Sequence, residues 1–231
     1  MQIRHATLAD LNAIMAVEQA SFGDGIAKEA MATREQMSSR LKLFAQKNFT
    51  EGFLLAEHKG MVVGYIIMFP TFRTPNQCVS WDVATDFGNI AGEFYALGRN
   101  IFVASLGVVA SAPEAASCAL IHATQVIRAT RLRVLGYSHD HYMFCSRMPG
   151  YARAHKKTGI SPEEYWRLED THGAPRDPLL NMFYQMMAEK PFKLLLNGYP
   201  PDHASAGHSV LFALEDTIAN LNALAACMYN K

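Results

Sequence analysis

The segment 101–130 places an apolar strand directly before a long helix. Its sequence, IFVASLGVVASAPEAASCALIHATQVIRAT, runs from an apolar stretch through a short turn into an alanine-rich helical pattern. The first N–H groups of a helix have no partner inside the helix, and they carry a partial positive charge. The junction therefore predicts an anion-binding site in the middle of a fold that mixes strands and helices.

The composition of the turn argues against an anion-binding site. There is no glycine between Gly107 and Gly136, and an acidic residue, Glu114, begins the helical pattern. Ser111 and Glu114 have the spacing of a capping box, in which a helix satisfies its own first N–H groups. An exposed carboxylate there opposes a phosphate by only about 0.3–1 kcal/mol. The sequence therefore leaves open whether the helix start binds a phosphate or is capped by its own serine and glutamate.

Charge balance narrows the class of protein. The chain has 231 residues, 50% of them apolar, which suffices for one domain with a sizeable core. Its 21 basic residues balance 21 acidic residues, which disfavours binding to nucleic acid or to an anionic membrane surface. We therefore expect a single domain over residues 1–231.

Targeting signals and cysteines indicate the compartment. The start, MQIRHATLADL, contains charge and no apolar leader, and no apolar run reaches the ~18 residues of a membrane span. The cysteines are widely separated, and we expect them to be reduced and buried: Cys78, Cys118, Cys145 and Cys227. A cytoplasmic protein is expected.

Periodicity and capping residues predict the order of elements. In the first half we expect a strand at 2–5, a helix after Thr7, a helix at 30–46, a hairpin with strands at 53–57 and 61–69, and an irregular segment at 70–99. In the second half we expect a strand at 101–109, helix 112–131, a strand at 132–137, helices beginning at Ser161 and Asp177, closing strands at 192–196 and 209–214, and a last helix at 216–228.

Several segments together resemble the GCN5-related N-acetyltransferase (GNAT) family. IRHATLADLNAIMAVEQASF looks like its first strand and helix, GFLLAEHKGMVVGYIIMF like its central hairpin, and SLGVV like its cofactor strand. WDVATDFG, MPGY, SPEEYW, DPLL and a late GYPPD segment follow the order of a subgroup sometimes fused to nitrilase-like domains, of which none is recognisable here. The resemblance implies an α+β fold with a mixed central sheet flanked by helices, here with a helical insertion at about 147–190.

The resemblance also implies a cofactor site for acetyl-CoA or another acyl-CoA. Backbone groups of the cofactor strand would pair with the pantetheine arm, which points to Leu106, Gly107, Val108 and Val109. Backbone groups at the helix start would meet the pyrophosphate, which points to Ala112, Ala115, Ser117 and Cys118. The family's usual arginine or glutamine and first glycine are absent from this turn.

Catalysis in the family needs a base for the amine and an acid for the leaving thiolate. By resemblance the acid is Tyr151 in the MPGY segment, with Tyr142 as the second candidate; the alternative is that Tyr151 packs its ring and bonds its hydroxyl locally. Asp82 and Glu93 flank the loop beside the cofactor strand and are candidate bases, and the alternative for each carboxylate is a solvated surface group. His139-Asp140-His141 reads as a polar turn, so no metal site is predicted.

Two functions stay open at this level. The first is an N-acyltransferase that moves an acyl group from a CoA thioester to a small-molecule or peptide amine, with no nucleic-acid or membrane partner and with a homodimer as an open alternative. The second is a GNAT-fold binding or regulatory module that has lost catalysis through its altered turn. The ASAPEAAS turn separates the two.

Overall fold

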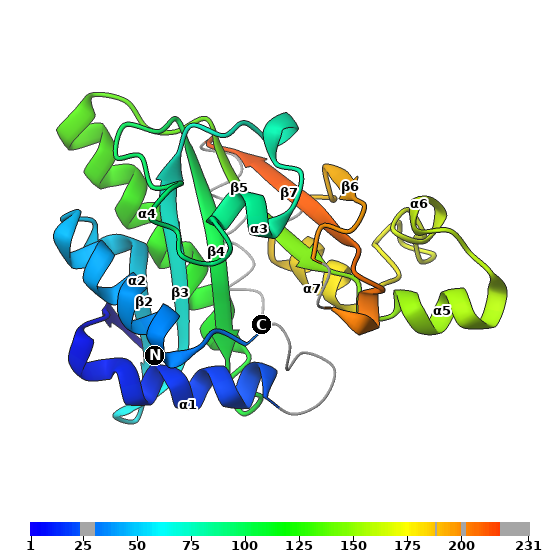
Figure 1. The fold of residues 1–231 in the computed structure, drawn as a ribbon, viewed down its shortest axis with the longest axis horizontal. Coiled ribbons are helices and arrows are strands. Elements are labelled where there is room, and N and C mark those ends of the chain that lie inside the picture. The colour runs from blue at the N-terminus through cyan, green and yellow to red at the C-terminus, as the bar shows by residue number, and fades with distance from the viewer. Residues whose placement is uncertain (24–30, 188, 200–201, 218–231) are drawn as a thin grey trace.

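The computed structural model describes residues 1–23, 31–187, 189–199 and 202–217, and its strands form one mixed sheet. The strands are β1 (Gln2–His5), β2 (Phe53–His58), β3 (Met61–Thr71), β4 (Asn100–Val108), β5 (His141–Arg147), β6 (Lys193–Leu195) and β7 (Ser209–Glu215). Their order in the sheet is β1-β2-β3-β4-β5-β7-β6 (Figure 1). Among these described strands, only β4 and β5 pair in parallel, and the other neighbours are antiparallel.

Helices cover both faces of this sheet. They are α1 (Leu11–Phe22), α2 (Arg34–Gln46), α3 (Trp81–Thr85), α4 (Glu114–Leu135), α5 (Tyr151–Thr158), α6 (Pro162–Tyr165) and α7 (Pro178–Met187). Tyr65 of β3 reaches Glu18 of α1, whereas its neighbour Gly64 lies against Ala115 of α4. Because successive side chains of a strand point to opposite faces, α1 and α4 lie on opposite sides of the sheet. The predicted α+β fold with a flanked mixed sheet is confirmed.

Local sequence signals begin and end several of these elements. Ser161 caps α6 as predicted, because its side chain accepts a hydrogen bond from the Glu164 N–H. The Thr33 side chain accepts a hydrogen bond from the Gln36 N–H at the start of α2, a cap that the predicted helix at 30–46 did not include. Lys59 and Gly60 adopt φ of 51° and 77° in the turn between β2 and β3, which is the left-handed conformation that a tight hairpin requires.

Two predictions around residue 135 were wrong. The segment 132–137 is not a strand, because α4 continues to Leu135 and ends at Gly136 with φ of 75°. The strand lies later, as β5, in the stretch interpreted from sequence as a polar turn and helix. The predicted helix at 216–228 falls almost entirely outside the described residues.

The second half of the chain inserts helices before closing the sheet. Helices α5, α6 and α7 lie between β5 and β6 in the sequence, and α5 and α6 lie at the end of the molecule away from α2 (Figure 1). Within the described residues, no helix combines the length and apolarity that a membrane span requires.

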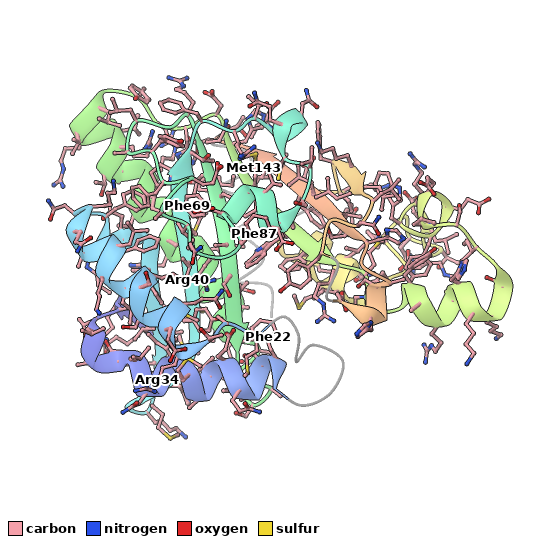
Figure 2. All side chains as sticks on the ribbon, viewed as in Figure 1. Phe22, Arg34, Arg40, Phe69, Phe87 and Met143 are labelled. Atoms are coloured by element: carbon pink, nitrogen blue, oxygen red, sulfur yellow. The ribbon has the colours of Figure 1, made fainter. Side chains whose placement is uncertain are left out.

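The irregular segment 70–99 is anchored in the core by one aromatic side chain. The ring of Phe94 is 4% exposed, and its centroid lies 5.7 Å from Phe44, 5.6 Å from Phe49 and 6.3 Å from Phe69. Aromatic pairs at these separations add to the free energy of burial. Phe87, in the same segment, is 69% exposed (Figure 2).

Replacing Phe94 with alanine should therefore lower the free energy of unfolding by about 3 kcal/mol, because it leaves a cavity among three aromatic rings. Urea unfolding followed by circular dichroism measures the change. The control is Phe87→Ala, which should leave the midpoint nearly unchanged. Equal effects of the two variants would contradict the anchoring role of Phe94.

Candidate functional site

The sheet opens between β4 and β5. The two strands pair only from Asn100 opposite His141 to Val103 opposite Phe144. Beyond that point β4 continues along β3, and β5 continues along β7 to Arg147 opposite Ser209. Among the described strands, one edge of β4 therefore lacks a partner over its last residues, and a gap divides the sheet.

A bulge in β4 lies at the start of this gap. The register with β3 shifts between Ile67 and Met68, which leaves Ala104 without an opposite residue. The indole Nε1 of Trp81 donates a 2.9 Å hydrogen bond to the Ala104 carbonyl oxygen. Trp81 is held in turn by its own N–H, which donates to the Gly198 oxygen at 2.9 Å, so α3 fixes the bulge to the segment before β7.

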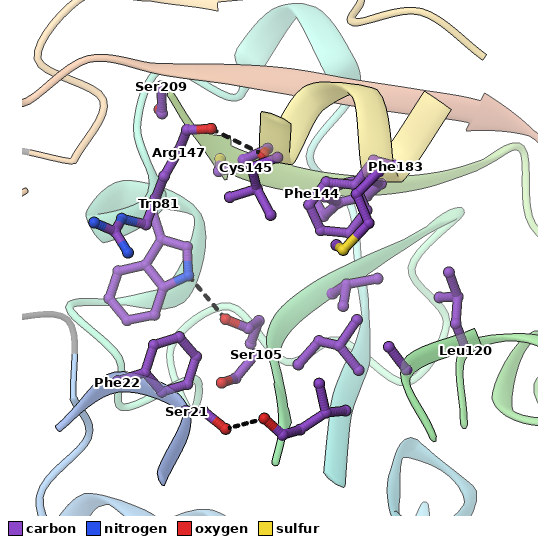
Figure 3. A pocket seen from close by; sticks show the side chains of 18 of the residues that line it. Ser21, Phe22, Trp81, Ser105, Leu120, Phe144, Cys145, Arg147, Phe183 and Ser209 are labelled. Atoms are coloured by element: carbon purple, nitrogen blue, oxygen red, sulfur yellow. Dashed lines mark hydrogen bonds between the residues drawn. The ribbon is translucent and has the colours of Figure 1, made fainter. Parts of the chain in front are cut away.

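A cavity of about 380 Å³ occupies the gap (Figure 3). It extends from one face of the sheet to the other. On the α1 side it meets Phe22, Trp81, Ser105 and Tyr199, and on the α4 side it meets Leu106, Leu120, Phe144 and Phe183. The cavity is therefore mixed in character on one face and apolar on the other, which is typical of a small-molecule site.

The free edge of β4 presents backbone groups to the gap. The Val109 N–H donates to the Val63 oxygen of β3, so alternation along the strand turns the backbone groups of Leu106 and Val108 toward the gap. The Ser21 hydroxyl confirms this direction, because it donates to the Val108 oxygen at 2.8 Å (Figure 3). Of the four residues predicted on this strand, Leu106 and Val108 line the cavity.

The other two residues predicted on this strand, Gly107 and Val109, do not line the cavity. A Cβ atom at Gly107 would lie 2.5 Å from the ring carbon Cε1 of Tyr65, so glycine is required there for the tyrosine to lie across β4. Val109 is half-buried, and its backbone N–H is used by β3.

The start of α4 differs from the predicted capping box. The residue before the helix is Pro113, no side chain caps it, and Glu114 is exposed. The N–H groups of Ala115 and Ala116 donate to the oxygens of Ala112 and Pro113 at 3.0 and 3.3 Å. The box was wrong because α4 begins at Glu114 with Pro113 as its N-cap, so Ser111 lies two residues before the N-cap position that the pattern assigns to it.

The residues predicted at this helix start do not line the cavity. Ala112 and Ala115 pack with Ala56 and Val63 in a small apolar cluster beneath β2 and β3. Ser117 and Cys118 are half-buried on α4. Helical spacing instead turns a different stripe of α4 toward the gap, made of Pro113, Ala116 and Leu120.

The predicted acid–base residues lie in three places. Asp82 follows Trp81 on α3, and burial raises the pKa of its carboxyl. Glu93 accepts a 2.6 Å hydrogen bond from Arg73 Nε in a salt bridge. Tyr151 is 3% exposed, packs on Tyr165, and is not among the residues that line the cavity, so its catalytic role stays a prediction.

The second tyrosine candidate is part of the core. Tyr142 is 3% exposed, its hydroxyl donates to the Thr124 oxygen at 2.8 Å, and burial raises its pKa.

Several polar residues of the cavity lining escaped prediction from sequence, among them Trp81, Ser105, Arg147 and Tyr199. Trp81 and Tyr199 pack edge to face with ring centroids 5.2 Å apart. Burial, followed by the charge of Asp82, raises the pKa of Tyr199 to about 12, so its hydroxyl keeps its proton at neutral pH. The WD and GY dipeptides that contain these rings were the only signals in the sequence.

Arg147 at the end of β5 is held by a buried carboxylate. Its Nε and Nη2 atoms donate to the two oxygens of Asp202 at 2.7 and 2.6 Å. Ser205 also donates to Asp202, and the Ser205 hydroxyl accepts from the Met148 N–H at 2.8 Å. This network fixes the cavity wall to the loop before β7.

Comparisons with known proteins identify the fold. No protein-family model and no curated protein sequence matches the chain. Among solved structures, "GphF GNAT-like decarboxylase in complex with isobutyryl-CoA" is similar with a TM-score of 0.72 and 20% identity, over 93% of this chain and 99% of that chain. The loading GNATL domain of CurA from Lyngbya majuscula is similar with a TM-score of 0.72 and 17% identity, over 93% of this chain and 96% of that chain.

A third similar structure is an N-acetyltransferase from Staphylococcus aureus Mu50, with a TM-score of 0.51 and 17% identity over 93% of this chain and 97% of that chain. Identities this low establish the fold alone. The chain has the GNAT fold, as its motifs predicted.

Replacing Asp202 with asparagine should lower the free energy of unfolding by about 3 kcal/mol at pH 7, because Arg147 then lacks its buried partner. Burial alone would raise the pKa of Asp202, but hydrogen bonds from Arg147 and Ser205 lower it below the unfolded value. The stabilisation is therefore complete above about pH 4 and disappears as pH falls through the folded pKa.

Urea unfolding at pH 7 and in acid measures this difference. The control is Asp140→Asn, which breaks an exposed pair with Arg99 and should change stability little. A pH-independent loss in Asp202→Asn would contradict the ionic origin of the stabilisation.

Proposed function

We propose that this chain binds an acyl-CoA in the gap between β4 and β5 and transfers the acyl group to an amine. The observation that carries the proposal is the free edge of β4, where Leu106 and Val108 turn backbone groups into a cavity of about 380 Å³. A flexible amide-containing chain can pair with such an edge, and the cavity beside it can hold an apolar acyl group. The similar GNAT-like decarboxylase, solved in complex with isobutyryl-CoA, supports this ligand class.

The residues of the gap fit this ligand. The pantetheine arm has amide groups, which match the edge groups of Leu106 and Val108, although Ser21 already uses one acceptor on Val108. Toward the phosphates the segment 112–118 offers the partial positive charge of α4. Ala115 and Ala116 contribute through that charge, because their N–H groups are already bonded. Glu114 opposes a phosphate only weakly, since its side chain is exposed.

The chain's own residues then position the reactants and move protons. The thioester supplies the carbonyl carbon that the amine attacks. Tyr199 lines the cavity with its proton in place, so it is suited to protonate the departing sulfur. Of the two predicted carboxylates, Asp82 follows Trp81 on α3 but does not itself line the cavity, whereas Glu93 is neutralised by Arg73.

A second candidate is decarboxylation of an α-carboxyacyl-CoA such as malonyl-CoA, in which the electron pair of the broken carbon–carbon bond passes into the thioester enolate. Among the described residues, no carboxylate or histidine lines the cavity, and loss of CO₂ requires hydrogen-bond donors for the resulting enolate rather than a base. The two similar structures with a TM-score of 0.72 are a GNAT-like decarboxylase and a loading GNATL domain. Either reaction uses the same cavity.

Binding and turnover of acetyl-, isobutyryl- and malonyl-CoA should test the proposal. Calorimetry gives the affinity, thiol release with and without primary amines gives transfer, and CO₂ release gives decarboxylation. Ala116→Met should weaken binding at least 10-fold, because it fills the cavity from α4. The control Ala129→Met makes the same change on an exposed face of α4. Absence of binding to every acyl-CoA would overturn the proposal.

Tyr199→Phe should lower kcat about 100-fold without changing the affinity for acyl-CoA, because it removes the proton donor but keeps the ring. Tyr151→Phe is the matched control, since it also removes one buried hydroxyl. Steady-state rates and calorimetry measure both effects. A loss of kcat in Tyr151→Phe alone would assign the acid to Tyr151, as the sequence predicts.

A further inference from the structure

A carboxylate and a phenol lie buried together beneath the α1 side of the cavity. Glu18 of α1 is 1% exposed and Tyr65 of β3 is fully buried. The Tyr65 hydroxyl donates to Glu18 Oε2, and the Ala32 N–H donates to Glu18 Oε1 at 2.6 Å. Both carboxylate oxygens are therefore bonded, and the phenolic proton points at the carboxylate.

Ser105 of β4 connects this pair to the cavity. Its Oγ lies 2.8 Å from the Tyr65 hydroxyl, and its side chain lines the cavity (Figure 3). Because the Tyr65 proton is directed to Glu18, the Ser105 hydroxyl is the donor in the bond to Tyr65. Its lone pairs then remain for a group in the cavity.

We propose that Ser105, Tyr65 and Glu18 form a proton relay that removes the proton of the attacking amine. The inference rests on the proposed function and names the base that the cavity lining itself does not contain. As the nitrogen–carbon bond forms, the amine proton passes to Ser105 Oγ, the Ser105 proton passes to Tyr65 Oη, and the Tyr65 proton passes to Glu18 Oε2. The relay ends with a neutral Glu18 carboxyl and with both hydroxyls restored.

The charges around Glu18 suit a base. Arg40 of α2, labelled in Figure 2, is a nearby cation. Its Nε donates to the Gly88 oxygen at 2.8 Å rather than to Glu18. Burial raises the pKa of Glu18, while the bonds from Tyr65 and Ala32 and the charge of Arg40 oppose the rise. Tyr199 is the other titratable group close enough to interact with Glu18. A carboxylate with a raised pKa is a stronger base than one on the surface.

The same bonds also join α1 to the sheet, so the test must separate catalysis from folding. Ser105→Ala removes only the cavity end of the relay, Ser105→Thr keeps a hydroxyl, and Glu18→Gln keeps the shape of the other end. Tyr142→Phe is the control, because it removes a hydrogen-bonded hydroxyl of the core that lies outside the cavity lining. The full chain is assayed for amine-dependent CoA release from acetyl- and isobutyryl-CoA over a pH series.

Ser105→Ala and Glu18→Gln should each lower kcat about 100-fold. In the wild type kcat should fall as pH drops through the pKa of Glu18, and this acid limb should be absent from both variants. The KM for acyl-CoA and the melting temperature of Ser105→Ala should match those of Tyr142→Phe, and Ser105→Thr should recover most of the rate.

The relay is overturned if Ser105→Ala retains the wild-type kcat and acid limb, or if Ser105→Thr fails to recover activity that Ser105→Ala has lost. Those results leave acyl transfer itself intact. A wild-type protein that releases no CoA, or releases it without need of the amine, overturns the proposed function and the relay together.

Discussion

The end of pairing between β4 and β5 is the constraint on which the rest of this structure depends. Past Val103 and Phe144 each strand keeps its outer partner and loses its inner one, so the sheet stays whole on both sides of a gap. The bulge at Ala104 begins the separation, and Trp81 binds its free carbonyl. The cavity, the exposed edge of β4 and the access to Ser105 all follow from this one interruption.

Two buried polar networks hold the walls of the gap in place. On the β4 side, Glu18, Tyr65 and Ser105 connect α1 to the sheet, and on the β5 side Arg147 and Asp202 connect the strand to the loop before β7. Buried polar groups are costly unless their hydrogen bonds are satisfied, and a satisfied network fixes geometry. The two walls of the gap are therefore held in place, although β4 and β5 do not pair with each other there.

The sequence predicted elements where local signals agree with the final packing. The capped start of α6, the hairpin at Lys59 and Gly60 and the strand-to-helix junction were of this kind. The prediction from sequence failed at β5. This strand begins with a polar residue that is typical of a turn, and its pairing partners lie over 40 residues away in β4 and over 60 residues away in β7. Because β5 was not predicted, Arg147 at its end was not recognised as a residue of the cavity. The pair of Glu18 and Tyr65 could not be predicted, because 47 positions separate them and only the fold brings them together.

Gly107 has a consequence for anyone redesigning this protein. It was expected to serve a ligand, but its hydrogen faces the ring of Tyr65, and an added Cβ would lie 2.5 Å from Cε1. The ring is fully buried and has no room to withdraw. Reshaping of the cavity therefore has to proceed from α4 and α7, through Leu120 and Phe183, because the centre of β4 does not accept a larger side chain.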